Sequence, residues 1–134
     1  MGLSLASPAI GYHLDPAAEH VRRVEDETAI QVLLEALNDP DCRDILDVTS
    51  DFALTAAEVS ETCDIPLSTT YRKLDHLTDA GLLEEGTRIR NSGKHTSEYR
   101  RLVESVIVSL TPSGETALHV ANRRDAERIG SPAQ

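Results

Sequence analysis

Apolar residues recur with helical spacing early in the chain. The run consists of Ile30, Leu33, Leu34 and Leu37. Steps of three and four positions place these side chains on one face of a helix, with acidic residues 25–27 in or just before its first turn, where the helix dipole favours negative charge. Pro40 stops this helix at Asn38, because a proline disfavours helical geometry in the residue before it. A second helix is predicted from Asp41 to about Val48, with Ile45, Leu46 and Val48 facing inward.

Two shorter helices joined by a tight turn are predicted next. Thr55 and Glu58 have the spacing of a capping box, in which each side chain accepts from the other's free backbone amide. The helix that they open ends near Cys63, and a new one begins at Pro66 to Ser68. The buried stripe of that helix is predicted to be Leu67, Thr70, Leu74 and Leu77. Gly81 stands where a helix ends in a left-handed residue.

The pattern changes to strands after this helix. Residues 83–90 and 97–110 are the strand candidates, and the turn sequence Asn91-Ser92-Gly93-Lys94 lies between them. Thr111-Pro112-Ser113 ends the second strand and is predicted to cap a last helix, from Glu115 to about Ile129. The apolar stripe of that helix is weak and consists of Ala117, Leu118, Ala121 and Ala126.

These elements predict a mainly α fold with a small β-hairpin, an α+β winged helix-turn-helix. Residues 1–24 are expected to form a flexible N-terminal arm, residues 25–110 the winged helix-turn-helix domain, and residues 111–134 a C-terminal helix that dimerises, followed by a tail. At 134 residues the chain has room for one domain and none for a second, catalytic one. It has no apolar stretch of the roughly 20 residues that span a bilayer, and no basic leader, so we expect a cytoplasmic protein without membrane contact.

Charge is distributed unevenly along the chain. Acidic residues number 23 and basic ones 13, a formal net charge of −10, which by itself argues against nucleic acid as a partner. Residues 66–101 hold seven basic and five acidic side chains, so this window is +2 and the remainder is −12. The basic surplus coincides with the second helix of the helix-turn-helix and with the hairpin, the two elements suited to phosphates. An acidic composition with only two lysines is also typical of proteins from salt-in halophiles.

The exposed face of that helix and the hairpin supply the candidate DNA-binding residues. On the helix, about residues 67–80, these are Ser68, Thr69, Thr70, Tyr71, Arg72, Lys73 and His76; on the wing, about residues 84–100, they are Arg88, Arg90, Lys94 and His95. Arginine pairs bidentately with guanine, and small hydroxyls bond bases or phosphates. Tyr71 has two interpretations, either capping the core or donating its hydroxyl to a phosphate.

Other chemistry has weaker support in the sequence. Cys42 and Cys63 lie 21 positions apart outside any CxxC pair, so they are interpreted as two small buried residues or, alternatively, as a thiol-based redox or metal sensor. The five histidines form no HxxxH pair, and Glu84-Glu85 has no nucleophile or phosphate loop beside it. We therefore expect no enzyme activity, no metal and no cofactor.

The segments Tyr71-Arg72-Lys73-Leu74 and Ala80-Gly81-Leu82-Leu83 are specific enough to name a family. Over about residues 29–110, the chain resembles the ArsR-type (arsenical-resistance repressor) winged helix-turn-helix transcription regulators, most closely their haloarchaeal relatives. Residues 36–46 are similar to that family's ALxDPxRxxIL signature, with Cys42 where arginine is commonest and Arg43 one place on. The paired-cysteine metal box of metal-responsive members is absent, since Cys63 stands alone, so metal sensing through that site is not supported.

The resemblance implies a homodimer, formed by the first and last helices, that binds a pseudo-palindrome in double-stranded DNA with its two recognition helices in successive major grooves. It leaves the effector unknown. Two other functions stay open from the sequence: a winged-helix module that binds another protein through its acidic face, and a thiol-responsive switch that uses Cys42 and Cys63.

Overall fold

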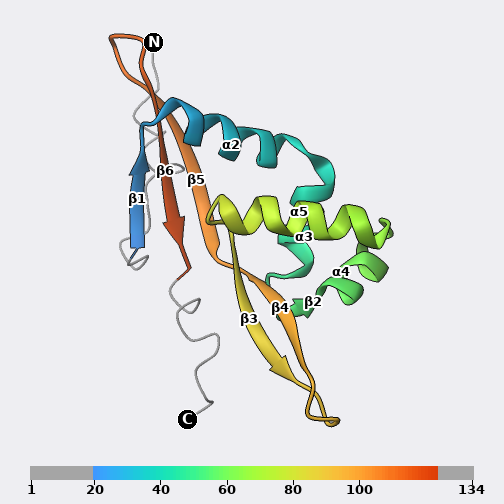
Figure 1. Ribbon diagram of the computed structural model, residues 1–134. Coiled ribbons are helices and arrows are strands. Elements are labelled where there is room, and N and C mark those ends of the chain that lie inside the picture. Colours follow the sequence, from blue (N-terminus) through green and yellow to red (C-terminus); the bar gives the residue numbers. More distant parts are fainter. Residues whose placement is uncertain (1–19, 124–134) are drawn as a thin grey trace.

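The computed structural model describes residues 20–123, which form two antiparallel sheets with helices packed against them (Figure 1). The described helices are α2 (Glu27–Asn38), α3 (Pro40–Val48), α4 (Ala56–Cys63) and α5 (Leu67–Asp79). The strands are β1 (His20–Val24), β2 (Leu54–Thr55), β3 (Leu83–Ile89), β4 (His95–Arg101), β5 (Val103–Leu110) and β6 (Thr116–Asn122). The predicted fold class, an α+β winged helix-turn-helix, is confirmed.

Local capping sets the helix boundaries where the sequence places them. Asp26 accepts from the Ala29 amide at 3.0 Å and starts α2, while Asp39 accepts from the Asp41 amide at 2.9 Å and starts α3. The capping box of α4 is present in both directions, with Thr55 N donating to Glu58 Oε1 at 2.9 Å and Glu58 N to Thr55 Oγ1 at 3.2 Å. These bonds satisfy amides that the first turn of a helix leaves without partners.

The C-terminal end of α5 forms a Schellman motif. Leu82 N donates to Leu77 O at 2.9 Å and Gly81 N to Thr78 O at 3.0 Å, with Gly81 at φ 80°. Arg22 of β1 donates from Nη2 to Ala80 O at 3.0 Å. The guanidinium therefore covers the negative end of the α5 dipole and fixes β1 against it.

We expect Gly81→Ala to lower the free energy of unfolding by about 1 kcal/mol, because an L residue is strained at this positive φ. A Cβ at position 81 would also lie 2.5 Å from Arg22 Nη2. Urea unfolding of Gly81→Ala with and without Arg22→Ala separates the two effects. If the penalty disappeared in the Arg22→Ala background, the cause would be the side-chain clash and not the backbone.

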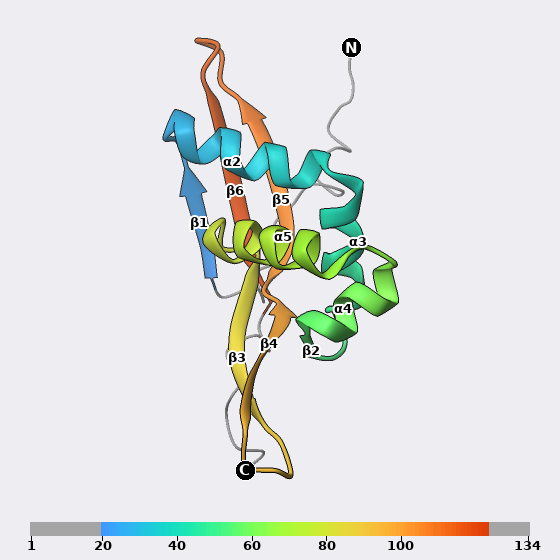
Figure 2. The ribbon, with the colours of Figure 1, turned by 45° about the vertical axis from the view of Figure 1, so that its right-hand side comes forward.

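The wing is the hairpin of β3 and β4, which belong to a sheet of order β2-β4-β3. Its turn closes through Gly93 N to Arg90 O and Arg90 N to Lys94 O, both at 2.8 Å, with Gly93 at φ 85°. This is a three-residue hairpin loop that ends on a left-handed glycine. The predicted turn at residues 91–94 is thus confirmed, and the wing extends away from the helices (Figure 2).

The second sheet corrects both predicted ends of the domain. Its order is β1-β6-β5, so residues 20–24, predicted within a flexible arm, form an edge strand; residues 1–19 lie outside the described part. The helix predicted from Glu115 is wrong over Thr116–Asn122, which is β6, and its predicted continuation beyond residue 123 is not described. Alternation explains the strand: Leu118 and Val120 enter the core cluster, while His119 between them points to the opposite face.

The predicted single strand over residues 97–110 is two strands in different sheets. The chain changes sheets at Leu102, where Arg101 N donates to Thr49 O at 3.0 Å and Leu102 N to Leu82 O at 2.9 Å. Thr49 is fully buried at the end of α3, and its hydroxyl donates to Ile45 O at 2.7 Å. Contacts with distant segments therefore break a strand that its local sequence favours.

One core joins the helices to both sheets. Its fully buried large side chains include Leu33, Ile45, Leu74, Leu77 and Leu118. In Figure 2, α2 lies across one face of the β1-β6-β5 sheet and α5 lies below it, at the junction with the wing. This packing fixes the direction of α5 relative to β3 and β4.

Candidate nucleic-acid interface

The N-terminal half of α5 presents polar side chains to solvent. Ser68 and Arg72 are exposed, Tyr71 is 50% exposed, and Thr69 is half-buried. Thr70, Leu74 and Leu77 form the predicted buried stripe, whereas Leu67 is 44% exposed at the helix start. Thr70 is 0% exposed and its hydroxyl donates to Pro66 O at 2.9 Å, which corrects its inclusion among the DNA-binding residues.

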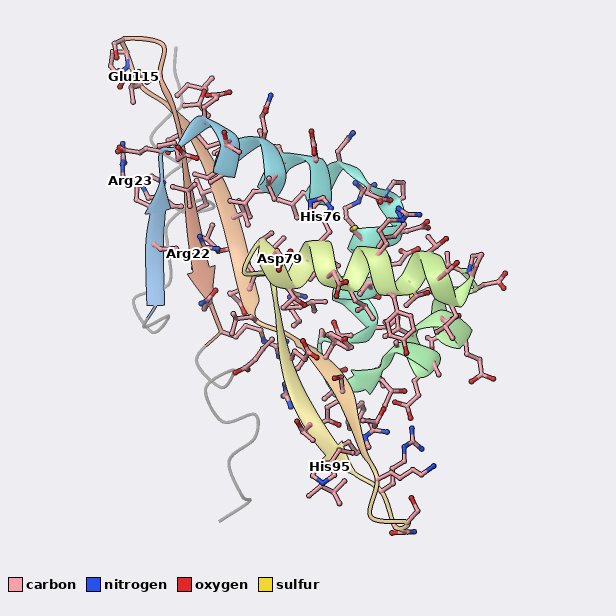
Figure 3. The ribbon with its side chains drawn as sticks, viewed as in Figure 1. Arg22, Arg23, His76, Asp79, His95 and Glu115 are labelled. Carbon is pink, nitrogen blue, oxygen red and sulfur yellow. The ribbon has the colours of Figure 1, made fainter. Side chains whose placement is uncertain are left out.

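The C-terminal half of α5 is acidic on its exposed side. Asp75 and Asp79 are both exposed, and Asp79 lies at the end of α5 that leads into β3 (Figure 3). Carboxylates repel phosphates, so this end of α5 is unsuited to nucleic acid. His76 is half-buried one helical turn from Arg72, in the part of α5 that Figure 3 shows nearest α2, and lies far from His95 of the wing. The usable surface of α5 is therefore its first two turns.

Lys73 is turned toward the body of the domain and does not lie on the outer face. Its Nζ pairs with Asp39 Oδ2 at the start of α3 and lies 4.0 Å from Asp41 Oδ2, and the Lys73 side chain is only 15% exposed. The hydrogen bond from Lys73 holds the pKa of Asp39 below its usual value, against the opposing effect of burial. Lys73 thus joins α5 to α3, whereas the sequence predicted a contact with the DNA groove.

Cys42 lies beside this ion pair. It is 1% exposed, and its Sγ donates to Asp39 Oδ2 at 3.6 Å. Burial, with the negative charge and hydrogen bond of Asp39, raises the pKa of Cys42 to about 11. Burial and nearby aspartates also raise the pKa of the half-buried Cys63. Both thiols are therefore protonated at neutral pH and weak nucleophiles, which gives the thiol-switch hypothesis no support.

We expect both cysteines to react slowly with a thiol reagent at neutral pH, and Cys63 to react before Cys42, because Cys63 is less buried. Labelling followed by mass spectrometry of the intact and digested chain measures both rates. Rapid labelling of Cys42 in the folded protein would contradict the burial and the raised pKa described above.

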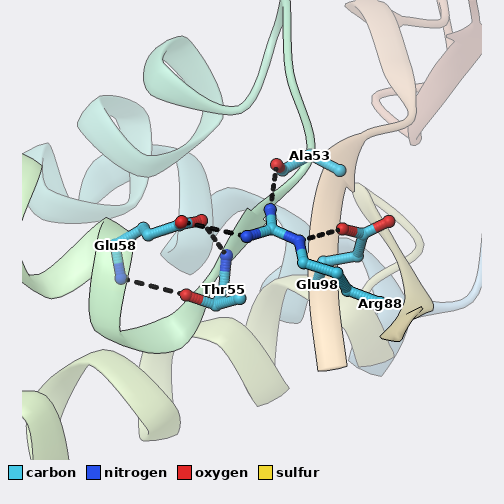
Figure 4. Close-up of polar contacts among 5 residues, drawn as sticks. All are labelled: Ala53, Thr55, Glu58, Arg88 and Glu98. Carbon is cyan, nitrogen blue, oxygen red and sulfur yellow. Dashed lines mark hydrogen bonds and ion pairs between the residues drawn. The ribbon is translucent and has the colours of Figure 1, made fainter. Parts of the chain in front are cut away.

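Arg88 is held inside a network that connects the wing to α4 (Figure 4). Its Nε donates to Glu98 Oε1 at 2.8 Å, its Nη1 to Glu58 Oε2 at 2.9 Å, and its Nη2 to Ala53 O at 3.0 Å. Hydrogen bonds from Arg88 lower the pKa of Glu58, and those carboxylates in turn raise the pKa of Arg88. All donor groups of the guanidinium are directed at the protein, so Arg88 positions the wing.

A polar cleft of about 420 Å³ separates the wing from the start of α4 and from α5. It is lined by Thr55, Ala56 and Ala57 of the α4 start, Tyr71 of α5, and Arg90, His95, Thr96, Ser97 and Tyr99 of the wing. The structure thereby brings together three of the predicted site residues, Tyr71, Arg90 and His95. Tyr71 is half-exposed at this cleft, so it does not serve only to cap the core, the first of its two predicted interpretations.

Three basic side chains of residues 66–101 form neither an ion pair nor a hydrogen bond with another described residue: Arg72 on α5, and Arg90 and Lys94 on the wing. Lys73 and Arg88 are paired as above, and Arg101 donates to Val103 O at 2.7 Å and Glu104 O at 3.2 Å. Arg100 of β4 is half-buried and also interacts within the protein. The charge surplus read from the sequence therefore reduces to three accessible cations per chain, all on the two predicted contact elements.

Within residues 20–123, no three His, Cys, Asp or Glu side chains are grouped so that they could hold a metal ion. No helix of that part of the chain combines the length and the apolar character needed to cross a membrane. Sequence reasoning missed the inward roles of Lys73 and Arg88, since Asp39 and Glu58, which hold them against α3 and α4, are 34 and 30 residues away. A spacing rule within one helix or hairpin carries no signal for such contacts.

A family of helix-turn-helix domains matches residues 37–86, which run from the end of α2 through α5 into β3. A comparison with the curated proteins finds no match to this chain.

Several solved structures are similar in part. The homodimeric winged helix-turn-helix DNA-binding domain of Mb0332 from Mycobacterium bovis is 20% identical, with a TM-score of 0.46 over 55% of this chain and 64% of that one. The match thus spans less than two thirds of the Mycobacterium chain. NolR from Sinorhizobium fredii is 20% identical (TM-score 0.46, 66% and 78% of the two chains), and reduced HlyU from Vibrio cholerae is 26% identical (0.43, 55% and 73%). At such TM-scores the likeness transfers no ligand, partner or assembly to this chain.

Proposed function

We propose that this chain is a sequence-specific DNA-binding transcription regulator of the ArsR type, acting as a homodimer and without enzymatic activity. The observation that carries the proposal is that the three exposed basic side chains without an ion pair among the described residues lie on α5 (Arg72) and on the wing (Arg90 and Lys94), in a chain of net charge −10. Tyr71 of α5 and Arg90 of the wing line the polar cleft between these two elements. The helix-turn-helix match over residues 37–86 supports it. Such a regulator would act in the cytoplasm, where the DNA is.

Exposure and charge indicate which residues contact which part of the DNA. The first two turns of α5 enter the major groove, where Arg72 reads guanine and the hydroxyls of Ser68 and Thr69 bond bases or phosphates. Arg90, Lys94 and His95 contact the backbone or the minor groove from the wing, and Tyr71 donates its hydroxyl to a phosphate between them. Lys73, His76 and Arg88 do not contact DNA in this arrangement. They hold α5 and the wing in place within the domain.

The acidic composition bears on the salt concentration at which the protein binds DNA. If the chain functions in molar salt, as its composition suggests, the Debye length there is about 3 Å, so long-range attraction to DNA is screened. Direct contacts by the three cations and the hydroxyls then supply the affinity. This is why we assign specificity to close base contacts and not to net charge.

The test is a binding isotherm on selected genomic fragments across a salt series. With three accessible cations per protomer, a dimer releases at most about six counterions, so log K should fall with log salt at a slope of about −5. Arg72→Ala should weaken specific binding at least tenfold and relax the preference for guanine at the contacted position, whereas Lys94→Ala should reduce the slope by about 2 per dimer. Arg23→Ala, an exposed cation of β1, is the matched control and should change neither the affinity nor the slope.

Equal affinity for all fragments, unchanged by Arg72→Ala, would overturn the proposal. In that case, capture of a protein partner that survives nuclease treatment would favour the alternative, a winged-helix module that binds protein through its acidic face.

A further inference from the structure

The outer edge of β5 has no partner strand among the described residues. In the sheet order β1-β6-β5, β5 pairs on one side only, with β6. Thr111 N donates to Glu115 O at 2.8 Å and closes the β5-β6 hairpin. Since hydrogen-bonded pairs alternate along an antiparallel ladder, Ser109 and Ile107 bond to β6, and Val106, Val108 and Leu110 direct their N–H and C=O groups outward.

The side chains of these three residues share the face of the sheet on which the helices pack. Val106 contacts the core cluster, Val108 is 51% exposed and Leu110 is 74% exposed. The edge therefore combines free backbone groups with uncovered apolar side chains, which together favour the addition of a strand.

Two of the other sheet edges carry charges that protect against strand addition, and the third is short. β1 has Arg22 and Arg23, β3 has Glu84, Glu85 and Arg88, and β2 has only two residues. By contrast, the only ionisable residue of β5 is Glu104 near its start, and residues 105–110 include no ionisable side chain, proline or glycine. In a chain of net charge −10, this is a segment where two copies approach without like charges facing each other.

We propose that β5 pairs with β5 of a second copy, antiparallel about a two-fold axis at Val108, to give one continuous six-stranded sheet. In this register Val108 faces Val108 of the copy and Val106 faces Leu110, so all outward groups of the three residues bond in pairs. An antiparallel pair of identical strands is self-complementary, as a two-fold interface requires.

The charges at the ends of the strands agree with this register. It brings the tip of the copy's β5-β6 hairpin, which carries Glu115 (Figure 3), to the Val103 end of β5. A groove of about 370 Å³ lies at that end, and its charged lining residues are Arg43 and Arg101 together with Asp47 and Glu104. Both guanidinium groups donate to backbone carbonyls, and neither forms an ion pair with Asp47, Glu104 or another described carboxylate. Each arginine is therefore available to pair with Glu115 of the copy.

The pairing deepens the homodimer of the proposed function and rests on it, but replaces the interface that the sequence suggested. The resemblance implied an interface formed by the first and last helices. In the structure, however, Thr116–Asn122 is the strand β6, and the apolar face of α2 is already packed in the core of its own chain. The test is made without DNA, so its failure leaves the DNA-binding proposal standing.

The experiment uses charge at the two-fold position. Val108→Lys and Val108→Glu each place like charges opposite each other, so each protein alone should be monomeric by sedimentation equilibrium, with dimer association weakened at least tenfold. An equimolar mixture of the two should recover the dimer, because opposite charges then face each other. Val21→Lys on the other edge of the sheet is the control and should leave the wild-type dimer unchanged.

Hydrogen exchange tests the same register without a substitution. The amides of Val106, Val108 and Leu110 should be protected at concentrations where the wild type is dimeric and exchange rapidly in the monomer, while Ile107 and Ser109 stay protected in both. Circular dichroism confirms that each variant is folded. A wild-type monomer, a dimer that survives Val108→Lys, or protection of these three amides in the monomer, which would indicate that residues 1–19 or 124–134 cover the edge, would each overturn the proposal.

Discussion

Lys73→Met is expected to lower the free energy of unfolding by about 3 kcal/mol. The substitution removes the cation that pairs with Asp39 in a largely enclosed site, with side chains 15% and 28% exposed. Breaking such a pair from one side leaves the other charge desolvated without compensation, and this costs more than the pair itself contributes. Chemical denaturation with fluorescence or circular dichroism measures the change.

Arg72→Met is the matched control, because Arg72 is the neighbouring cation on the same helix and lies exposed. Its effect on stability should be within about 0.5 kcal/mol. In a DNA-binding assay the order of the two variants should be reversed. Arg72→Met should lose affinity for DNA, whereas the folded Lys73→Met should keep the wild-type slope of log K against log salt. Equal stability losses in the two variants would mean that Lys73 is not held by Asp39 in solution.

The ion pair also predicts how stability depends on pH. Lys73 lowers the pKa of Asp39 in the folded chain. A carboxyl with a lowered folded pKa stabilises fully above its unfolded pKa, about 4, and loses that contribution as pH falls through the folded value. Wild type should therefore lose stability relative to Lys73→Met between about pH 4 and the lower folded pKa. Unfolding curves that stay parallel over this acid range would contradict the assignment.

Local signals in the sequence were sufficient for most helix boundaries. Asp26, Asp39 and the Thr55–Glu58 capping box begin α2, α3 and α4, and Gly81 ends α5, each through bonds within a few residues. Each of these capping bonds joins residues only a few positions apart, so a short stretch of sequence is sufficient to predict it.

The parts that failed depend on distant contacts. Leu102 breaks the predicted strand because the neighbouring amides bond to Thr49 and Leu82, and residues 116–122 form β6 because β1 and β5 pair with them on both sides. The short run Thr116–Asn122 fits a weak helical stripe and an alternating strand about equally, so tertiary pairing decides. For the site, the sequence identified the correct two elements but could not distinguish accessible cations from those paired inside the fold.

Arg88→Ala is expected to show that Arg88 fixes the position of the wing and does not itself contact DNA. The substitution leaves Glu58 and Glu98 without their shared cation and removes the bond to Ala53 O. We expect a loss of about 2 kcal/mol in unfolding free energy, moderated because these side chains are 20% to 43% exposed. Arg88→Lys should recover only part of it, since an ammonium cannot reproduce the three directed bonds of a guanidinium.

The effect on DNA binding distinguishes a positioning residue from a contact. Arg88→Ala should weaken binding about tenfold, because a wing released from α4 no longer presents Arg90 and Lys94 in one fixed arrangement beside α5. The slope of log K against log salt should stay at the wild-type value, since Arg88 releases no counterion from DNA. Arg90→Ala should do the reverse, with a reduced slope and unchanged stability. If Arg88→Ala lowered the slope while stability stayed the same, Arg88 would leave its carboxylate partners to bind phosphate, and the network in Figure 4 would not persist on DNA.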